Sequence, residues 1–240
     1  MIDKEYLRRL AVGFDVALDD TQLSRFDRYA EMLVEWNEKM NLTGITDPAD
    51  MVLKHFADSL SLLSVLPPDA VTLIDVGTGA GFPGVPLAIA SPALHMTLLD
   101  SLQKRLRFLD VVCEELELSA VTVHARAEDG GHNPALREHF DVATARAVAA
   151  LPTLCEYCLP FVKPGGVFVA MKGPESDAET NASKAAAAAL SGRYRETASL
   201  LLDDCNGEQY QRRLIVFDKS EKTPARFPRD AAKIKRAPLG

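Results

Sequence analysis

Apolar and polar residues follow a helical spacing through the first quarter of the chain. Over residues 1–65 the apolar positions recur every three or four residues, which is typical of amphipathic helices. Asp20 or Thr21 is predicted to cap a helix with one apolar face, made by Leu23, Phe26, Ala30, Leu33 and Val34. Turn-forming residues at 41–48 end this helix, and helical spacing returns over 51–66. The pair Pro67-Pro68 then marks a boundary.

Beyond that boundary, short apolar runs alternate with stretches of helical spacing. The pattern predicts strands at 71–76, 96–100, 121–125, 141–146 and 166–171, and helices at 84–91, 102–117 and 150–162. Strands that alternate with helices form βαβ units and a mostly parallel sheet. An α/β fold of the Rossmann-like type is therefore predicted.

The last third of the chain predicts a different edge to this sheet. An alanine-rich helix at 183–190 precedes two β-like runs, 199–202 and 212–217, which flank turn formers at 203–207. Such a separation suits an antiparallel pair, which brings the expected sheet to seven strands. We divide the chain into a helical segment (1–67), an α/β core domain (68–218) and a basic tail (219–240).

Composition favours one globular unit in a reducing compartment. Of the 240 residues, 47% are hydrophobic, which suffices for one substantial core. The first residues lack the apolar core of a signal peptide, and no apolar run approaches the roughly 20 residues that span a bilayer. The four cysteines are too few for a disulfide scaffold, so we expect a cytoplasmic protein without membrane partners. Cys155 and Cys158 have C-x-x-C spacing but no second pair, so we expect packing and no metal site.

Charge is unevenly distributed. The net charge of −7 argues mildly against nucleic-acid binding, yet residues 219–240 hold seven lysines and arginines and two acidic residues. A basic tail on an acidic body could face phosphates, or it could be a solvated, frayed end. The sequence leaves both interpretations open.

The segment Asp75-Val-Gly-Thr-Gly-Ala-Gly-Phe-Pro-Gly84 directly follows the first predicted strand. Glycines permit the tight turn and the close backbone approach that a nucleotide-like ligand needs after a strand of an α/β sheet. Residues 79–84 match the dinucleotide pattern G-x-G-x-x-G. The glycine that directly follows the strand is Gly77, however, so the match starts too late for its first glycine to form the tight turn after the strand. Pro83 also lacks the amide that would bind a pyrophosphate.

S-adenosylmethionine fits this segment better than a dinucleotide. It has no pyrophosphate, and its sulfonium and amino groups favour an acid at the end of the first strand, where Asp75 stands. Its ribose hydroxyls favour an acid at the end of the second strand, where Asp100 stands. The two carboxylates and the glycines together predict an S-adenosylmethionine site.

Several segments together resemble one known family. They are Asp75–Gly84, Leu98–Arg105, Ala127-Glu128, Phe140–Ala147 and Met171–Gly173, with Trp36–Thr43 and His55–Ser59 in the helical segment. In this order and spacing they resemble the bacterial 16S ribosomal RNA guanine-N7 methyltransferases, first named glucose-inhibited division protein B. The resemblance covers nearly the whole chain. It implies a class I S-adenosylmethionine-dependent fold, 16S ribosomal RNA or the 30S subunit as partner, methylation of a guanine in the 530 loop, and a monomer.

The resemblance also implies roles for particular residues. The cofactor would contact Asp75, Gly77, Thr78, Gly79, Gly81, Phe82, Asp100, Ala127, Glu128 and Arg146. Arg146, just past the fourth strand, would also face the incoming guanine and act as the catalytic residue. The RNA side would include Asn41, His55, Asp58, Arg126 and Lys172, to which the tail adds Arg226 and Arg229. The tail departs from the family pattern at Ala232 and Ile234, where glycine and proline are typical.

The chemistry of guanine N7 agrees with the residues after the fourth strand. N7 carries a lone pair and no proton to lose, so an aligned in-line transfer needs no general base. Enzymes that methylate exocyclic amines usually have Asn/Asp-Pro-Pro-aromatic there, and those that methylate cytosine C5 need a cysteine, whereas this chain has Ala145-Arg-Ala-Val148. Arg146 suits a guanine Hoogsteen edge or a phosphate.

Other interpretations of these residues stay open at this stage. Arg146 could instead form a structural ion pair, and His55 could be a structural histidine. A methyltransferase for a small molecule or a protein, a nicotinamide-dependent oxidoreductase, and a nucleotide-binding module without activity are the alternative functions.

Overall fold

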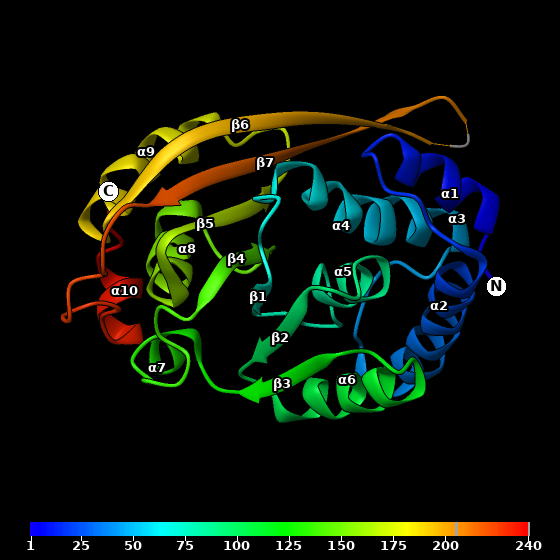
Figure 1. Cartoon of the computed structure of the whole chain (residues 1–240), viewed down its shortest axis with the longest axis horizontal. Helices are drawn as coiled ribbons and strands as arrows, with labels where there is room; N and C mark the ends of the chain where they lie inside the picture. Colours follow the sequence, from blue (N-terminus) through cyan, green and yellow to red (C-terminus); the bar gives the residue numbers. More distant parts are fainter. Residues whose placement is uncertain (205, 240) are drawn as a thin grey trace.

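The protein is described by a computed structural model that covers residues 1–204 and 206–239. Its centre is a seven-stranded sheet with the order β3-β2-β1-β4-β5-β7-β6 (Figure 1). Strands β1 to β5 run parallel to one another, and β7 runs antiparallel to both β5 and β6. The strands are β1 Thr72–Val76, β2 His95–Asp100, β3 Ala120–His124, β4 Phe140–Arg146, β5 Val162–Lys172, β6 Gly192–Asp203 and β7 Gln209–Lys219. The predicted fold class is confirmed.

Helices and helical turns connect and cover these strands. They are α1 Lys4–Val12, α2 Asp20–Met40, α3 Pro48–Asp50, the π-helix η1 Met51–Ala57, α4 Asp58–Leu60, the 3₁₀ turn η2 Ser61–Val65, α5 Gly84–Ala90, α6 Gln103–Glu115, α7 Ala127–Gly130, α8 Leu151–Cys158, η3 Leu159–Phe161, α9 Asp177–Ala189 and α10 Ala231–Arg236. The cap of α2 is Asp19, one residue before the predicted position, and it forms a reciprocal capping box with Gln22.

Two hydrophobic cores lie on opposite faces of the sheet. Because successive strand residues point to opposite faces, Leu73 and Val142 pack toward α5, α6 and the N-terminal helices, while Ile74 and Ala143 pack toward α8 and α9. The predicted packing role of the C-x-x-C pair is confirmed, since Cys155 and Cys158 on α8 are buried in the second core.

The N-terminal helices are attached to the core domain at the glycine-rich loop. Tyr29 of α2 is fully buried and donates a 2.6 Å hydrogen bond to the carbonyl of Ala80. Gln22 reaches the last carbonyls of α5, those of Ile89 and Ala90, at 3.0 Å each. The loop after β1 is therefore supported from behind by α2.

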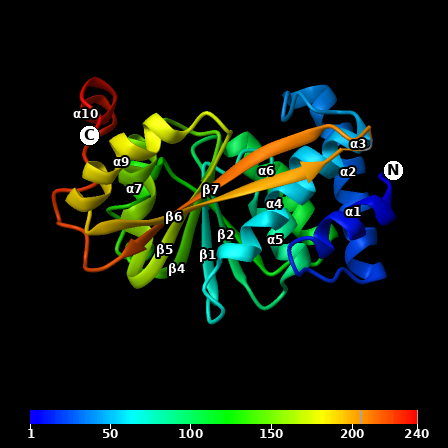
Figure 2. The same ribbon diagram turned by 90° about the horizontal axis from the view of Figure 1, so that it is seen from above.

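The β6–β7 hairpin is much longer than the sequence predicted. β6 begins at Gly192, well before the predicted run 199–202, and β7 extends past both ends of the predicted run 212–217, so that the hairpin crosses the molecule to reach α1 (Figure 2). Tyr6 of α1 donates a hydrogen bond of 3.0 Å to the carbonyl of Asp203 near the hairpin tip. The prediction was too short because much of β6 is exposed and carries charged residues, which hides its alternating pattern. Cys205, in the predicted turn, lies outside the described residues.

The basic tail folds back on the core domain. Phe227 and Ile234 are buried, and Arg137 donates hydrogen bonds to the carbonyls of Thr223 and Phe227. The interpretation of this segment as a frayed end is therefore wrong for the residues that the structure describes. Among those same residues, no helix combines the length and the apolarity that crossing a membrane requires.

Candidate active site

A cavity of about 350 Å³ opens at the carboxyl ends of β1, β2, β3 and β4. This is the edge at which open α/β sheets bind ligands. Its walls are formed by Val76, Gly77, Leu99, Asp100, Ser101, Arg105, Ala125, Arg126, Ala127, Glu128, Ala147, Val148 and Tyr157. Four of the predicted cofactor residues are therefore in its wall, namely Gly77, Asp100, Ala127 and Glu128.

Asp100 is the central carboxylate of this cavity. Its Oδ2 accepts from the amide of Gly79 at 2.9 Å and its Oδ1 from the amide of Leu102 at 2.8 Å. The guanidinium of Arg105 lies 3.5 Å from Oδ2. The carboxylate is almost fully buried, so its orientation is fixed before any ligand binds. Each oxygen keeps acceptor capacity for a ligand hydroxyl.

Glu128 forms the other polar wall of the cavity, from α7. Its Oε1 accepts a 2.6 Å hydrogen bond from Nε of Arg126, whose side chain is otherwise largely exposed. The ring of Tyr157 lines the same side from α8, and burial, with Glu128 as the next cause, raises the pKa of its hydroxyl. Arg126, predicted for the RNA side, thus lies in the cavity wall as a partner of Glu128.

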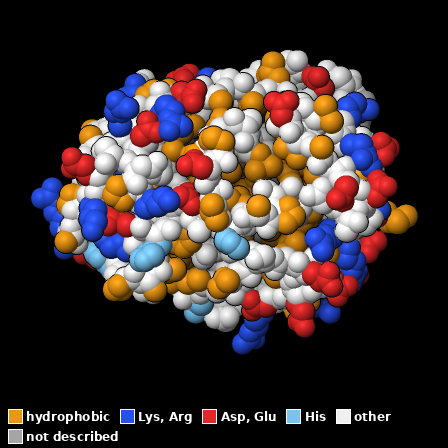
Figure 3. All heavy atoms as spheres, in the orientation of Figure 1, with side chains coloured by type: hydrophobic (Ala, Val, Ile, Leu, Met, Phe, Trp, Pro, Cys, Tyr) orange, Lys and Arg blue, Asp and Glu red, His pale blue; other side chains and the backbone are white. Residues whose placement is uncertain are grey.

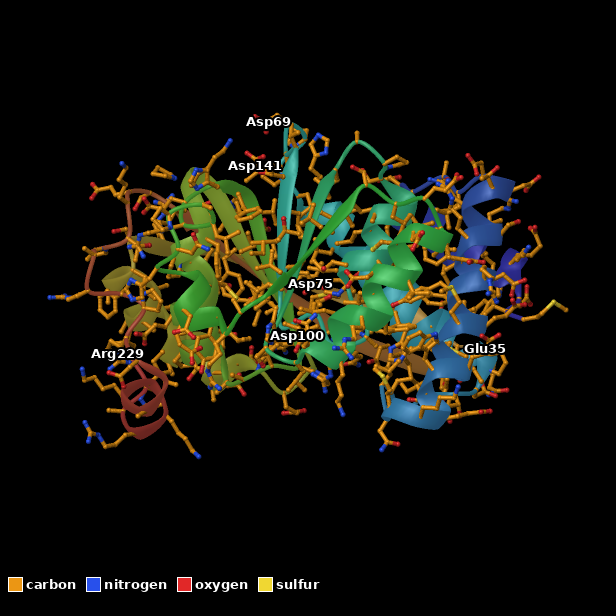
Figure 4. All side chains as sticks on the ribbon, turned by 90° about the horizontal axis from the view of Figure 1, so that it is seen from below. Glu35, Asp69, Asp75, Asp100, Asp141 and Arg229 are labelled. Atoms are coloured by element: carbon orange, nitrogen blue, oxygen red, sulfur yellow. The ribbon has the colours of Figure 1, made fainter. Side chains whose placement is uncertain are left out.

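Asp75 lies beneath the glycine loop and is not part of the cavity wall. Its Oδ2 accepts from Thr78 Oγ1 at 2.7 Å and from the amide of Gly84 at 2.9 Å, while Oδ1 is buried with no hydrogen-bond partner among the described residues. Burial raises the pKa of Asp75 to about 6, against the lowering effect of these two hydrogen bonds. Figure 4 shows Asp75 and Asp100 at one end of the sheet, opposite Asp69 and Asp141.

This arrangement also supports the argument against a dinucleotide. The Gly84 amide belongs to the first residue of α5, where a pyrophosphate would bind, and Asp75 already occupies it.

Gly77 and Gly81 are needed for different reasons. Both have a left-handed backbone, with φ of +73° and +104°. A Cβ on Gly77 would lie 2.7 Å from a methyl group of Val148 at the cavity wall, whereas a Cβ on Gly81 would lie 2.8 Å from the hydroxyl of Tyr29. Gly77 thus shapes the cavity, and Gly81 lets α2 approach the loop. Neither Thr78, Gly79 nor Gly81 is in the cavity wall.

Arg146 is held in a fixed orientation at the end of β4. Its Nη1 donates to the Lys54 carbonyl at 3.0 Å and to Asp58 Oδ2 at 2.9 Å, and its Nη2 lies 3.3 Å from His55 Nδ1. The guanidinium carbon is 4.9 Å from the ring centroid of Phe82, which stacks on His55. The side chain is only 12% exposed.

His55 is neutral in this setting. Burial, followed by the charge of Arg146, lowers its pKa to about 3. Its Nε2 lies 2.8 Å from the hydroxyl of Thr43.

Asp58 links two arginines from different strands. Its Oδ2 binds Arg146 of β4, and its Oδ1 accepts from Nε of Arg212 of β7 at 2.7 Å. With a side chain that is 1% exposed, Asp58 is placed to hold the arginines and cannot itself reach RNA. Arg212 was missed by the sequence analysis, because nothing in the local pattern of β7 relates it to a carboxylate 154 residues earlier.

The remaining predicted RNA residues are spread over the molecule. Asn41 ends α2 with a left-handed backbone. Lys172, at the end of β5, pairs with Glu179 Oε2 at 2.6 Å. Arg229 is bound to buried Glu156 and lies beside α10, away from the strand ends (Figure 4). Arg226 is exposed and stacks on Phe227, with its guanidinium 5.0 Å from the ring centroid.

Comparison with known proteins identifies the family of this site. Residues 22–205 match the family model described as rRNA small subunit methyltransferase G. The protein named ribosomal RNA small subunit methyltransferase G from Acetivibrio thermocellus is 47% identical over the full length of both chains. The protein of the same name from Exiguobacterium sp. is 48% identical, also over the full length of both. The chain belongs to this methyltransferase family.

A solved structure supports the fold of this family member. A putative transferase from Pyrococcus horikoshii superposes with a TM-score of 0.50 at 11% identity, over 85% of this chain and 66% of that one. At this identity the likeness concerns the fold alone.

The family and the fold make S-adenosylmethionine the cofactor, as the sequence predicted. The cavity fits such a group, because it has a buried carboxylate on each side and a glycine whose Cβ would collide with its wall. Asp100 would accept hydrogen bonds from the ribose hydroxyls, Gly77 would let the backbone approach, and Ala127, Glu128 and Tyr157 would surround the adenine. When bound, the cofactor supplies a methyl group on a sulfonium.

Several residues of this cavity were not predicted from the sequence. Ser101, Arg105, Val148 and Tyr157 line it, and Tyr157 lies between the two cysteines of the C-x-x-C spacing. The signal that could have found them is position, since each follows closely on the carboxyl end of a strand or faces it from the next helix.

Proposed function

We propose that this protein transfers a methyl group to N7 of a guanine in the 530 loop of 16S ribosomal RNA, within the small ribosomal subunit. The observation that carries the proposal is the fixed guanidinium of Arg146 at the end of β4, one residue before Ala147 in the cavity wall. Guanine presents O6 and N7 on one electronegative edge, which a fixed cation attracts and orients, while N7 has to keep its lone pair free for the methyl carbon.

The surroundings of Arg146 suit a methyl-accepting atom that carries no proton. Of the two titratable groups in contact with Arg146, Asp58 is engaged by two arginines, and the lowered pKa of His55 makes it a poor proton acceptor at neutral pH. Guanine N7 needs no such acceptor, because its lone pair attacks the methyl carbon directly. The enzyme then contributes by alignment and by excluding water, which are the main sources of rate for an in-line transfer.

Arg146 can align the base because several contacts fix the position of its own side chain. Asp58, the Lys54 carbonyl and the Phe82 ring hold the guanidinium from three directions. Because these contacts already fix the guanidinium, a base that contacts it is placed with little further loss of side-chain entropy.

Ribosomal RNA as the substrate rests on the family and on the local charge of the site. Figure 3 shows basic and acidic side chains interspersed over one face of the molecule, without a broad basic patch there. We infer that the shape of the folded subunit, together with Arg146 and the exposed Arg126 and Arg226, selects the target. Because base edges are hidden in A-form helices, the acceptor has to be a splayed or looped base. The protein is proposed to act as a cytoplasmic monomer.

Transfer of labelled methyl groups tests this function. The protein is incubated with labelled S-adenosylmethionine and 30S subunits from a strain that lacks the enzyme, and the digested RNA is separated by nucleoside mass spectrometry. We expect the label in 7-methylguanosine. Label in another nucleoside, in protein or in a small molecule would contradict the proposal. In calorimetric titrations, heat with NAD(P) and none with S-adenosylmethionine would favour an oxidoreductase instead.

A further inference from the structure

A second hollow, of about 280 Å³, shares Ala147 with the cofactor cavity. It is lined by Ala147, Met171, Lys172, Gly173, Pro174, Glu175, Ser176, Glu179 and Arg212. Ala147 belongs to both walls and has a left-handed backbone, with φ of +57°. The two spaces therefore meet at the residue that follows Arg146.

The hollow has hydrogen-bond donors that the fold does not use up. Arg212 spends only Nε on Asp58, and its two terminal nitrogens bond to no other described residue. Ser176, just before α9, is 2% exposed, and its Oγ has no partner among the described residues and caps no amide of that helix. A buried hydroxyl without a partner is uncommon and suggests a bound group. Lys172 spends two of its three N–H donors on Glu179 and the Ala149 carbonyl, which leaves one for a ligand.

The hollow also contains free acceptors. Glu175 is exposed and forms no ion pair or hydrogen bond with the described residues. Glu179 engages Oε2 with Lys172 and with the amide of Leu151. The lining holds two basic residues, Lys172 and Arg212, and two acidic residues, Glu175 and Glu179, so its formal charge is zero. A phosphate would require an excess of positive charge, whereas a neutral polar ring needs donors and acceptors together. Met171 and Pro174 add apolar surface on which a ring can pack.

We propose that this hollow binds the acceptor guanine, with Arg212 and Lys172 donating to O6 and the Glu175 carboxylate accepting from N1–H and the 2-amino group. The proposal rests on the function proposed above, which it deepens by naming where the base is read. N7, O6, N1 and the 2-amino group follow one another around guanine. If N7 points toward Ala147 and the cofactor cavity, O6 lies next to Arg212 and Lys172. The N1–H and 2-amino donors then lie farther round the ring, where a carboxylate can accept from them. A flipped base is read by its Watson–Crick edge in just such pockets.

Inosine tests whether the Glu175 carboxylate accepts a hydrogen bond from the 2-amino group of the base. Inosine keeps N7, O6 and N1–H but lacks the 2-amino group. Wild-type protein and the Glu175→Ala variant are assayed on 30S subunits reconstituted with guanosine or inosine at the acceptor position. We expect wild type to prefer guanosine roughly tenfold or more in kcat/KM, as for a hydrogen bond to a charged group, and Glu175→Ala to lose that preference. Asp177→Ala is the matched control, because Asp177 pairs with Arg213 outside the hollow and should leave the preference intact.

The outcomes separate this assignment from the function itself. If Glu175→Ala keeps the full preference for guanosine, the assignment is wrong while the function stands. If wild type methylates neither subunit, the proposed function falls and the assignment with it.

Ser176→Ala gives an independent readout. Its Oγ has no partner to lose, so thermal unfolding should be unchanged while KM for 30S subunits rises several-fold. Ser183→Ala, on the same helix, removes a hydroxyl that donates to the Thr180 carbonyl at 2.7 Å. This control should lower the melting temperature and leave KM unchanged. An unchanged KM for Ser176→Ala would exclude its hydroxyl from the site and contradict this part of the assignment.

Discussion

Asp58 and Arg146 form a buried ion pair of 2.9 Å between the N-terminal helical segment and the end of β4. The second oxygen of the same carboxylate holds Arg212 of β7 at 2.7 Å. One negative charge is thus shared by two arginines, and the group keeps a net positive charge at the point where the cofactor cavity and the second hollow meet. The helical segment therefore contributes to the candidate active site, because Asp58 and the Lys54 carbonyl fix side chains that come from distant strands.

Replacing Asp58 by asparagine should affect both stability and turnover. Breaking a buried pair leaves charges without compensation, which costs about 3–5 kcal/mol of the free energy of unfolding. We expect a large loss in urea-induced unfolding, reduced methyl transfer, and S-adenosylmethionine affinity within a few-fold of wild type by calorimetry. Asp50→Asn is the control, because its pair with Lys54 is exposed and should contribute no more than about 1 kcal/mol. Equal losses in the two variants would contradict the role of Asp58.

Substitutions of Asp100 and of Arg146 should affect different steps, namely cofactor binding and methyl transfer. Asp100→Ala removes the carboxylate of the cavity wall, so we expect weaker cofactor binding in calorimetric titrations. Arg146→Ala leaves that wall intact and should instead lower kcat or raise KM for the 30S subunit, by roughly 100-fold in kcat/KM if one fixed contact to the reacting base is lost. A comparable loss of cofactor affinity in both variants would contradict this division of roles.

The sequence predicted the sheet and part of the cavity wall, but not the residues that hold the arginine. Asp100 and Gly77 are identified by their position just after strands, which is a local signal. The partners of Arg146 come from residues about 90 positions earlier, and those of Asp58 include Arg212, so no local spacing encodes them. The roles of Thr78 and Gly81 also depend on the three-dimensional structure, because Thr78 donates to Asp75 and Gly81 lies against Tyr29.

His55 should make the protein sensitive to acid. Its pKa is about 3 in the folded protein and 6.5 when unfolded, so the unfolded chain binds the extra proton first as the pH falls. Its contribution to stability is therefore complete above pH 6.5 and is lost progressively toward pH 3, by about 2 kcal/mol at pH 5. Comparing urea unfolding of wild type and His55→Gln at pH 7 and pH 5 isolates this effect. The variant should lose less stability between the two values, and an equal loss would contradict the buried, neutral histidine.

Gly77→Ala should damage the cofactor cavity as well as the backbone. The new Cβ would lie 2.7 Å from Val148 and would force a left-handed residue, a cost of roughly 1–2 kcal/mol from the backbone alone. Gly165→Ala has a similarly left-handed backbone, with φ of +90°, but open space around the Cβ, so it should lose stability only. Calorimetry with S-adenosylmethionine should show weaker binding for Gly77→Ala and wild-type binding for Gly165→Ala. Unchanged binding in both would place the cofactor elsewhere.

The position of the methyl group in the RNA tests whether this protein methylates guanine N7 in the 530 loop. After reaction with 30S subunits from a strain lacking the enzyme, the RNA is cleaved chemically at 7-methylguanosine and the break is mapped by primer extension. Our account predicts one new break, in the 530 loop, with wild-type protein and none with Asp100→Ala. A break elsewhere, or methylated RNA that this chemistry does not cleave, would contradict it.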